Sequence, residues 1–566
     1  MENKAIAKQF KLLAQLMELH GENPFKIKSI TNAVFKIDKL ANPLALLSSA
    51  EISEIEGIGK GISAKISELL STGTLQELQD LIVKTPLGVV EMLAIKGIGP
   101  KKIAVIWKDL GIDTIGELFY ACNENRLIEA KGFGLKTQEE IKKAIEFSIA
   151  SNGRFLYAQI EPYVTLFYND LAISLNSVDM QAILGIAGQF RRACEIIDEL
   201  ILVLGTAKLE DVNRMFSEDE SYTQTEEFPL VWFKTLTNGL KVRVIITTAE
   251  RFQYDWFMAS GSDSHVSQVL PLLPADKFNY PDESAIYEQA GLNFIPAECR
   301  EGFGELEQAK TQEFPKLIEL SDLKGSLHNH STWSDGVHTL KEMALYCKSE
   351  LNLEYLGICD HSKVAVYAKG LSIERVLAQH QEIDQLNSEL APFYIFKGIE
   401  SDILSDGSLD YPEEILKSFD FIVASIHSPL KMDEEKATHR LIKAIENPYT
   451  TILGHPTGRL LLSRAGYPID YKKVIEACAA NDVAIEINAN PLRLDLDWRW
   501  HRFALEKGVK LAINPDAHRK EGFLDMKYGV LVGRKGGLTA SYNLNSYTLP
   551  ELTTYFKDRK VKKGII

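Results

Sequence analysis

The stretch KGSLHNH (324–330) decides the fold of the C-terminal half, because it is the first of seven predicted strands that finish close to potential metal ligands. The other six follow in order: YLGICDH (355–361), YIFKGIE (394–400), FIVASIH (421–427), TTILGHP (450–456), VAIEINAN (483–490) and VKLAINPDAH (509–518). Helical patterns separate them, and alternating strands and helices predict parallel β/α units. We therefore predict a distorted (β/α)7 barrel, one unit short of the eight-stranded form.

Nitrogen and oxygen ligands collect at these predicted strand ends, where parallel barrels place their reactive groups. The set has nine members: His328, His330, Asp335, His361, Glu400, His427, His455, Asp516 and His518. Imidazole and carboxylate without thiolate suit Mn²⁺, Zn²⁺ or Fe²⁺, and such a set matches about three ions at three or four ligands each. Glu400 is the expected bridge between two ions, and we assign catalysis to Glu400, Asp516 and His427.

The same segments resemble the motifs of the PHP (polymerase and histidinol phosphatase) phosphoesterase domain. The resemblance rests on SLHNHSTWSDG, ICDHSK, GIESDILSDGSLDYP, ASIHS, GHPTGRLL and NPDAH. It implies one ion on His328, His330, Glu400 and Asp516, a second on Glu400, His427 and His455, and a third on Asp335, His361 and His518. One departure is Ser326, where similar domains often carry an acidic residue, and we expect it to tune the site. Lys363 and Arg459 are candidate phosphate contacts beside the ions, or else ordinary surface charges.

Residues 1–150 have helical periodicity and three glycine turns spaced about 35 to 40 residues apart. The turns are EGIGKGISAKI around Gly57 and Gly59, KGIGPKKIAVI around Gly97 and Gly99, and KGFGLKTQEEI around Gly132 and Gly134. They resemble helix-hairpin-helix motifs, whose glycines expose backbone amides to a nucleic-acid phosphate. The alternative is three ordinary turns between helices. We predict contact with the DNA backbone.

Charge and composition narrow the function. The 566 residues carry a net charge of −15, with 19 basic and 19 acidic residues in 1–150. An acidic chain argues against nonspecific coating of DNA, because such binding draws on a basic excess. Six cysteines without a CxxC pair argue against a disulfide framework or a zinc ribbon. The sequence shows no membrane segment or signal peptide, so we expect a soluble cytoplasmic monomer.

The whole chain resembles a bacterial family-X DNA polymerase with a C-terminal PHP domain. The resemblance rests on GENPFKIKSITNAVFKI (21–37), GIAGQFRR (185–192), FMASGSDSH (257–265) and IPAECREGFGELE (295–307). It implies an α/β nucleotidyltransferase-like palm in which Arg191 and Arg192 hold a triphosphate. Lys26 and Lys28 are candidates for a lyase role by Schiff base at an abasic sugar, and the alternative is that both are solvated surface lysines.

The palm lacks carboxylates that nucleotidyl transfer needs. The family has an Asp-x-Asp pair after the arginines and a third carboxylate on a neighbouring strand, and together they hold two metal ions. In RRACEIIDELILV (191–203), Asp198 fills the first place but Leu200 occupies the second, and a slip of one residue would pair Glu199 with Ile201. GLKVRVIITT (239–248) puts Arg243 at the third place. Loss of one such element costs about 10² to 10³ in rate, so we predict an inactive polymerase half.

The predicted domains are a helical DNA-end-binding domain (1–90), a helix-hairpin-helix or fingers-like domain (91–151), a palm and thumb-like domain (152–310), a linker (311–323) and a PHP domain (324–566). We predict a metal-dependent DNA phosphodiesterase in repair, either a 3′–5′ exonuclease or an abasic-site endonuclease. Its expected partner is gapped, nicked or 3′-ended DNA, and its expected cofactors are three divalent ions. The alternatives are an active gap-filling polymerase, a histidinol-phosphatase-type enzyme and a non-enzymatic DNA-end binder.

Overall fold

The computed structural model describes residues 1–40, 42–55, 57–95, 97–128, 130, 132–150 and 153–566. The chain divides into two compact units, Met1–Ser148 and Ile149–Ile566. The predicted domain boundary at residue 151 lies outside the described residues. Among the described residues, no helix is long and apolar enough to cross a membrane.

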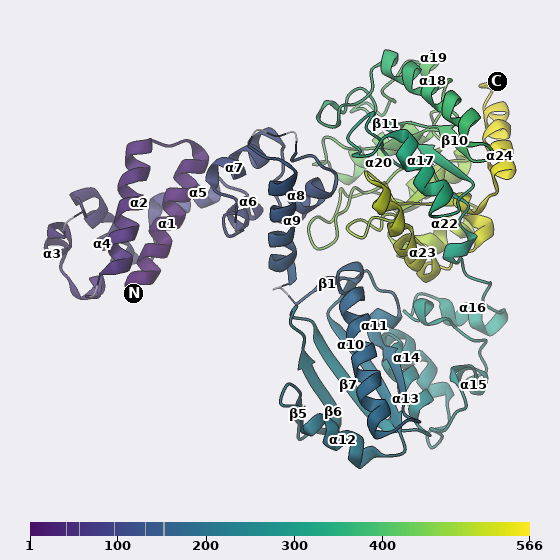
Figure 1. The fold of residues 1–566 in the computed structure, drawn as a ribbon, viewed down its shortest axis with the longest axis horizontal. Coiled ribbons are helices and arrows are strands. Elements are labelled where there is room, and N and C mark those ends of the chain that lie inside the picture. Colours follow the sequence, from purple (N-terminus) through teal and green to yellow (C-terminus); the bar gives the residue numbers. More distant parts are fainter. Residues whose placement is uncertain (41, 56, 96, 129, 131, 151–152) are drawn as a thin grey trace. The chain divides into compact units, whose positions relative to one another are not determined.

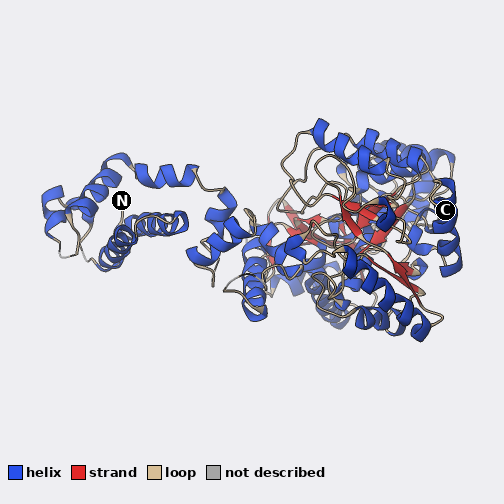
Figure 2. Cartoon of the chain, turned by 90° about the horizontal axis from the view of Figure 1, so that it is seen from above, coloured by secondary structure: helices blue, strands red, loops and turns tan. Residues whose placement is uncertain are grey.

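The first unit is helical, and its described residues form no strand (Figure 2). Its helices are α1 (Asn3–His20), α2 (Pro24–Lys39), α3 (Ser49–Glu54), α4 (Lys60–Thr72), α5 (Gln76–Val83), α6 (Leu87–Met92), α7 (Pro100–Ala104), α8 (Ile115–Asn123) and α9 (Leu135–Ala150). Helix α1 buries Ile6, Phe10, Leu13 and Met17 on one face, as its helical spacing predicts. Asn23 caps α2 by accepting a hydrogen bond from the Phe25 amide.

The second unit begins with an α/β segment built on a mixed five-stranded sheet, in the order β2-β4-β7-β6-β5. The strands of this segment are β1 (Phe155–Leu156), β2 (Ile183–Ala187), β3 (Ile196–Ile197), β4 (Glu199–Thr206), β5 (Thr223–Thr225), β6 (Phe228–Thr235) and β7 (Lys241–Thr248). Strands β1 and β3 form a separate antiparallel pair. Its helices are α10 (Tyr157–Val178), α11 (Gly188–Arg191), α12 (Leu209–Ser217), α13 (Phe252–Ser260), α14 (Asp263–Val269), α15 (Glu283–Gln289) and α16 (Glu305–Thr311). Helices α10 and α12 pack on one face of the sheet, and α13 covers part of the other (Figure 1).

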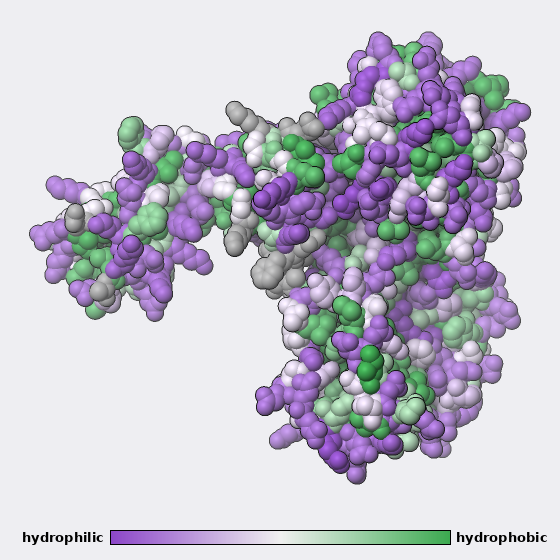
Figure 3. All heavy atoms as spheres, in the orientation of Figure 1, coloured by the Kyte–Doolittle hydropathy of each residue, from purple (hydrophilic) through white to green (hydrophobic). Residues whose placement is uncertain are grey.

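The rest of the second unit alternates parallel strands with helices. Its strands are β8 (Gly325–Ser326), β9 (Tyr355–Ile358), β10 (Tyr394–Lys397), β11 (Glu400–Asp402), β12 (Val423–Ser425), β13 (Ile452–Leu453), β14 (Ala484–Asn488) and β15 (Leu511–Asn514). Its helices are α17 (Leu340–Ser349), α18 (Ile373–Leu390), α19 (Glu413–Leu416), α20 (Glu434–Ile445), α21 (Tyr471–Asn481), α22 (His501–Glu506), α23 (Met526–Lys535) and α24 (Leu549–Lys562). Figure 3 shows one face of the whole chain, on which hydrophilic residues dominate and hydrophobic residues occur in patches between them.

A closed (β/α)7 barrel is not confirmed. The parallel strands form two sheets, β10-β9-β8 and β11-β12-β13-β14-β15. The run predicted as one strand over 394–400 divides at Gly398, where an added Cβ would lie 2.5 Å from Phe421 and 2.6 Å from the Ile358 carbonyl. The close packing at Gly398 coincides with the change from one sheet to the other. Among the described residues, single bridges join the two sheets: His361, after β9, pairs with Glu400 at the start of β11, and Asn329, after β8, pairs with Ala517, after β15.

Candidate metal centre

Segments that follow the parallel strands, together with Glu400 at the start of β11, bring the nine predicted ligands into one buried cluster. His328 and His330 follow β8, Glu400 begins β11, and Asp516 and His518 follow β15. Three groups each offer ligand atoms within 4.8 Å of one another: His330, Asp335, His361 and His518; His328, His330 and Glu400; and His361, Glu400 and His427. These groups overlap more than the partition implied by the PHP resemblance, because His330 and His361 each belong to two.

Glu400 is the centre of the cluster. Five histidine nitrogens lie 2.9 to 3.8 Å from its two oxygens: Nε2 of His455, His427 and His328 around Oε1, and His361 Nδ1 and His330 Nε2 around Oε2. Its side chain is 1% exposed. A carboxylate with imidazoles against both oxygens has the placement that a bridging ligand requires.

Two aspartates complete the anionic part of the cluster. Asp516 Oδ1 lies 3.0 Å from His330 Nε2 and 3.6 Å from His328 Nε2. Asp335 Oδ2 lies 3.4 Å from His361 Nε2 and 3.5 Å from His518 Nε2. Asp516 has φ +54°, a left-handed conformation that costs a non-glycine residue energy and that recurs at functional sites.

Several buried ligand atoms lie close to a neighbouring ligand but make no hydrogen bond of acceptable geometry with any described residue. They include His328 Nε2, His330 Nδ1, His361 Nδ1 and Glu400 Oε2. Buried polar atoms normally have partners, because an unsatisfied one costs free energy. The donor set is nitrogen and oxygen, as divalent transition ions prefer. The residues present therefore fit divalent metal ions.

A second layer of polar residues orients the ligands, and the sequence interpretation missed it. Glu486 Oε1 accepts a hydrogen bond from His328 Nδ1 at 2.7 Å, and its Oε2 accepts one from the His455 amide at 2.8 Å. Asp402 Oδ1 lies 3.1 Å from His427 Nδ1. A carboxylate in the buried strand AIEIN was the available signal for Glu486, because an unpaired charge would not be placed there.

Asp360 organises the loop that carries Asp335. Its carboxylate accepts hydrogen bonds from the amides and hydroxyls of Ser331 and Ser334 and from the Gln379 amide. Burial raises the pKa of Asp360. Ser326, the departure from the PHP pattern, is fully buried and hydrogen-bonded to the Asn329 side chain.

Proton affinities across the cluster follow its charges. Burial, together with repulsion from His518 and His361, lowers the pKa of His330 to about 3. Burial opposes a charged His328, but Glu486, Asp516 and Glu400 outweigh it and raise its pKa well above the usual value. Burial also opposes a charged Glu400, yet the surrounding histidines hold its pKa well below the usual range. The cluster thus stabilises positive charge beside its carboxylates.

The three glycine turns of the first unit share one backbone pattern. Gly57, Gly97 and Gly132 have φ of +89°, +96° and +87°, a region that favours glycine. Gly59, Gly99 and Gly134 precede α4, α7 and α9, and a Cβ on any of them would meet no atom within 4 Å. The fold therefore requires the first glycine of each turn and leaves the second open to a ligand at a helix N-terminus.

Comparison with known proteins matches this organisation. A model described as "Helix-hairpin-helix domain" matches residues 1–75, and one described as "SAM-like Helix-hairpin-helix tandem" matches residues 89–146. The DNA polymerase/3′-5′ exonuclease PolX of Bacillus subtilis (strain 168) is 33% identical over 98% of this chain and 100% of its own length. The chain belongs to the PolX family. A probable phosphatase of Thermoanaerobacter sp. (strain X514) is 33% identical over 30% of this chain and 71% of its own length, and a probable phosphatase of Acetivibrio thermocellus is 29% identical over 34% and 78%.

In this PolX-family chain, Glu199 and Arg243 form an ion pair on one face of the mixed five-stranded sheet. Leu200 is fully buried in the core under α10, so Glu199 and Ile201 project from the opposite face of β4. Ile201 pairs with Arg243 of β7, and Arg243 Nη2 lies 2.5 Å from Glu199 Oε2. Neither Leu200 nor Ile201 can supply the second carboxylate that the family pattern requires. Asp198 precedes β4 and is hydrogen-bonded to Gln189.

Arg191 and Arg192 are occupied by internal partners. Arg191 donates to both oxygens of Glu283 at 2.9 and 2.5 Å and stacks on Trp256, 3.4 Å from the ring centroid. Arg192 donates to Glu301 at 2.8 Å and to the Ser260 carbonyl at 2.9 Å. Both guanidinium groups therefore serve the fold in this arrangement.

The two predicted phosphate contacts in the C-terminal part differ in placement. Arg459 is 8% exposed and donates to Asp497 and to the carbonyls of Arg493 and Leu494. Lys363 is exposed, two residues after His361. Arg459 is thus paired inside the fold, whereas the Lys363 side chain is accessible to a phosphate.

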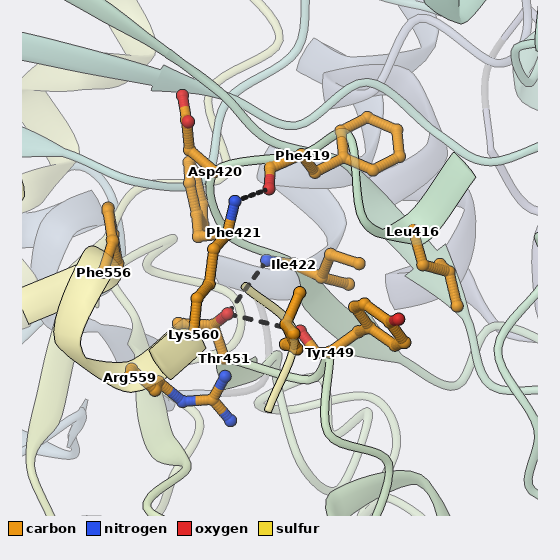
Figure 4. A pocket seen from close by; sticks show the side chains of 11 residues that line it. Leu416, Phe419, Asp420, Phe421, Ile422, Tyr449, Thr451, Phe556, Arg559 and Lys560 are labelled. Carbon is orange, nitrogen blue, oxygen red and sulfur yellow. Dashed lines mark hydrogen bonds between the residues drawn. The ribbon is translucent and has the colours of Figure 1, made fainter. Parts of the chain in front are cut away.

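A small pocket lies under α24, lined by residues that precede β12 and β13 (Figure 4). Lys560 donates to the Phe419 carbonyl there, and Thr451 links the Ile422 amide to the Tyr449 carbonyl. The amino end of a parallel sheet serves stability, whereas chemistry gathers at the carboxyl end. We therefore read this pocket as part of the support under the strands.

Proposed function

We propose that this PolX-family chain is a metal-dependent DNA phosphodiesterase, acting as a 3′–5′ exonuclease, an abasic-site endonuclease or both. The observation that carries the proposal is Glu400, a buried carboxylate with histidine nitrogens against both oxygens. Three divalent ions, Mn²⁺, Zn²⁺ or Fe²⁺, would bind the nine ligands. The proposal keeps the domain boundaries predicted from the sequence, with the chemistry in residues 324–566.

The site's own residues prepare it for hydrolysis. When bound, clustered divalent ions polarise the phosphoryl oxygens and activate water for attack on phosphorus. Glu486 holds His328 with Nδ1 protonated, which leaves its Nε2 directed at Glu400 and Asp516. Asp402 likewise holds His427 through Nδ1, which leaves Nε2 of His427 directed at Glu400. Asp360, through Ser331 and Ser334, fixes the loop that presents Asp335.

We propose that the palm binds DNA without adding nucleotides. The Glu199–Arg243 pair puts a guanidinium on the face where nucleotidyl transfer needs carboxylates. The helix-hairpin-helix turns supply backbone contacts to gapped, nicked or 3′-ended DNA. Support comes from Gly59, Gly99 and Gly134, which the fold does not require as glycines.

The proposal is tested with metal-depleted full-length protein on a 3′-recessed duplex. Mn²⁺, Zn²⁺ and Fe²⁺ are added separately, and nucleotide release and bound metal are measured together. Glu400→Ala should abolish hydrolysis and reduce bound metal, whereas His518→Ala should mainly empty one site. Glu476→Ala, which removes a 52%-exposed carboxylate on α21, is the matched control. Wild-type nuclease activity in Glu400→Ala would contradict the proposal.

A second candidate is a small-molecule phosphatase, favoured by the similarity to probable phosphatases. Under this reading, the helix-hairpin-helix domains would have no part in catalysis. Activity on histidinol phosphate with none on the DNA duplex would establish it in place of the nuclease.

A further inference from the structure

A loop beside the metal centre exposes apolar side chains. Tyr367 is 45% exposed, Val364 50% and Val366 81%. The Tyr367 ring centroid lies 6.1 Å from that of His361 and 6.5 Å from that of His427. An accessible aromatic ring therefore stands next to two of the proposed ligands.

The loop, residues 362–371, is tied to its neighbours by backbone contacts. Ser362 and Leu371 form a parallel bridge at its base, and the Ser362 amide donates to the Glu400 carbonyl at 3.0 Å. The Val364 amide donates to Asp410 at 2.6 Å. A Cβ at Gly370 would lie 1.9 Å from the Ser362 carbonyl, so this close approach requires glycine. The aromatic ring is thus carried on a pre-formed support.

The charges of the loop itself suit a nucleotide better than another protein surface. The segment KVAVYAKG (363–370) contains two lysines and no acidic residue, so an anionic strand meets no repulsion from it. Lys363 is exposed on the same loop. A phosphate at the metal centre would leave its attached base close to the ring, and bases stack on aromatic side chains with little sequence preference.

We propose that Tyr367 is a stacking platform for the base of the nucleotide whose phosphodiester lies at the metal centre. This inference rests on the proposed nuclease function and specifies its substrate class. The site takes a terminal nucleotide that is unpaired from the duplex, because a paired and stacked base cannot lie on the ring. Tyr367 acts in positioning, and its ring rather than its hydroxyl carries the effect.

The experiment compares two single-stranded tetranucleotides, one with a base on its 3′-terminal nucleotide and one with an abasic residue there. Full-length wild type, Tyr367→Ala, Tyr367→Phe and Tyr367→Trp are assayed for kcat/KM. Tyr163→Ala on α10, which removes a ring of the same 45% exposure, is the matched control. Binding of both oligonucleotides with a non-hydrolysable terminal linkage is measured by fluorescence anisotropy, so one readout is independent of hydrolysis.

Wild type should prefer the base-bearing oligonucleotide at least about tenfold in kcat/KM and in affinity. Tyr367→Ala should lose that preference, and the phenylalanine, tryptophan and Tyr163→Ala variants should keep it. A preference retained by Tyr367→Ala, lost by Tyr367→Phe or absent from wild type overturns the inference. If wild type hydrolyses neither DNA but its binding preference depends on Tyr367, the proposed function fails and the inference stands.

Discussion

The Glu486→Gln variant is expected to lose metal affinity while keeping its fold. Glu486 accepts four hydrogen bonds on two oxygens: His328 Nδ1 and Asn514 Nδ2 at Oε1, and the His455 amide and Asn488 Nδ2 at Oε2. Glutamine has nearly the same shape, but one of these oxygens becomes an NH₂ group that can only donate. The two buried N–H groups that bonded to that oxygen then face another N–H donor instead of an acceptor.

The magnitude follows from where that NH₂ group points. If it faces His455, two donors lose their acceptor, at about 1–3 kcal/mol for a buried unsatisfied group. If it faces His328, Nδ1 must accept, so the ring proton moves to Nε2 and blocks that atom as a ligand. Loss of a ligand's orienting partner typically costs about 10- to 100-fold in metal affinity or activity, which is about 1.4 to 2.7 kcal/mol. The first cost falls on stability, and the second falls on metal affinity.

The assay is a metal titration of depleted protein, followed by nuclease activity at each concentration. Glu486→Gln should need about 10- to 100-fold more metal, and excess metal should restore part of its activity. Glu413→Gln is the control, because Glu413 also accepts a side-chain hydrogen bond, from the Tyr449 hydroxyl at 2.8 Å. Wild-type metal affinity in Glu486→Gln, with an unchanged melting temperature, would refute the idea that Glu486 orients His328.

Three other predictions concern the rest of the chain. Primer extension on gapped DNA with Mg²⁺ or Mn²⁺ should be absent, because Arg243 pairs with Glu199, and templated extension that persists in Glu400→Ala would show the palm to be active. Gly59→Ala should weaken DNA binding without lowering the melting temperature, whereas Gly57→Ala, at φ +89°, should cost about 1–2 kcal/mol of stability. If the two variants lose DNA binding and stability to the same extent, both glycines are structural. Burial lowers the pKa of His501 to about 4, so between about pH 6.5 and pH 4 the unfolded chain binds a proton that the folded chain does not, and about 3 kcal/mol of stability is lost as the pH falls through this range. His501→Asn should therefore make the melting temperature less dependent on pH in this range, and an unchanged dependence would exclude His501 as its source.

The strand-end ligands were predictable because the carboxyl ends of parallel strands converge whatever the exact sheet order. The sequence therefore predicted that Glu400 and Asp516 lie in one cluster, as they do in the structure, although a closed barrel is not confirmed. It missed Glu486, since a hydrogen-bonding role depends on which neighbour a side chain faces. It also predicted one strand at 394–400, because periodicity does not reveal the close packing around Gly398 that accompanies the strand's division.

The two arginines expected to hold a triphosphate have carboxylate partners within the fold. A guanidinium without a phosphate still needs an anion when it is buried. Glu283 meets that need for Arg191 and also binds Arg300, while Glu301 binds Arg192. Glu301 also pairs with Lys535 of α23, a fully buried lysine from the C-terminal part of the unit. Through Glu301, Arg192 connects the α/β segment to the part of the chain that carries the candidate metal centre, so replacing Arg192 should disturb the packing between them.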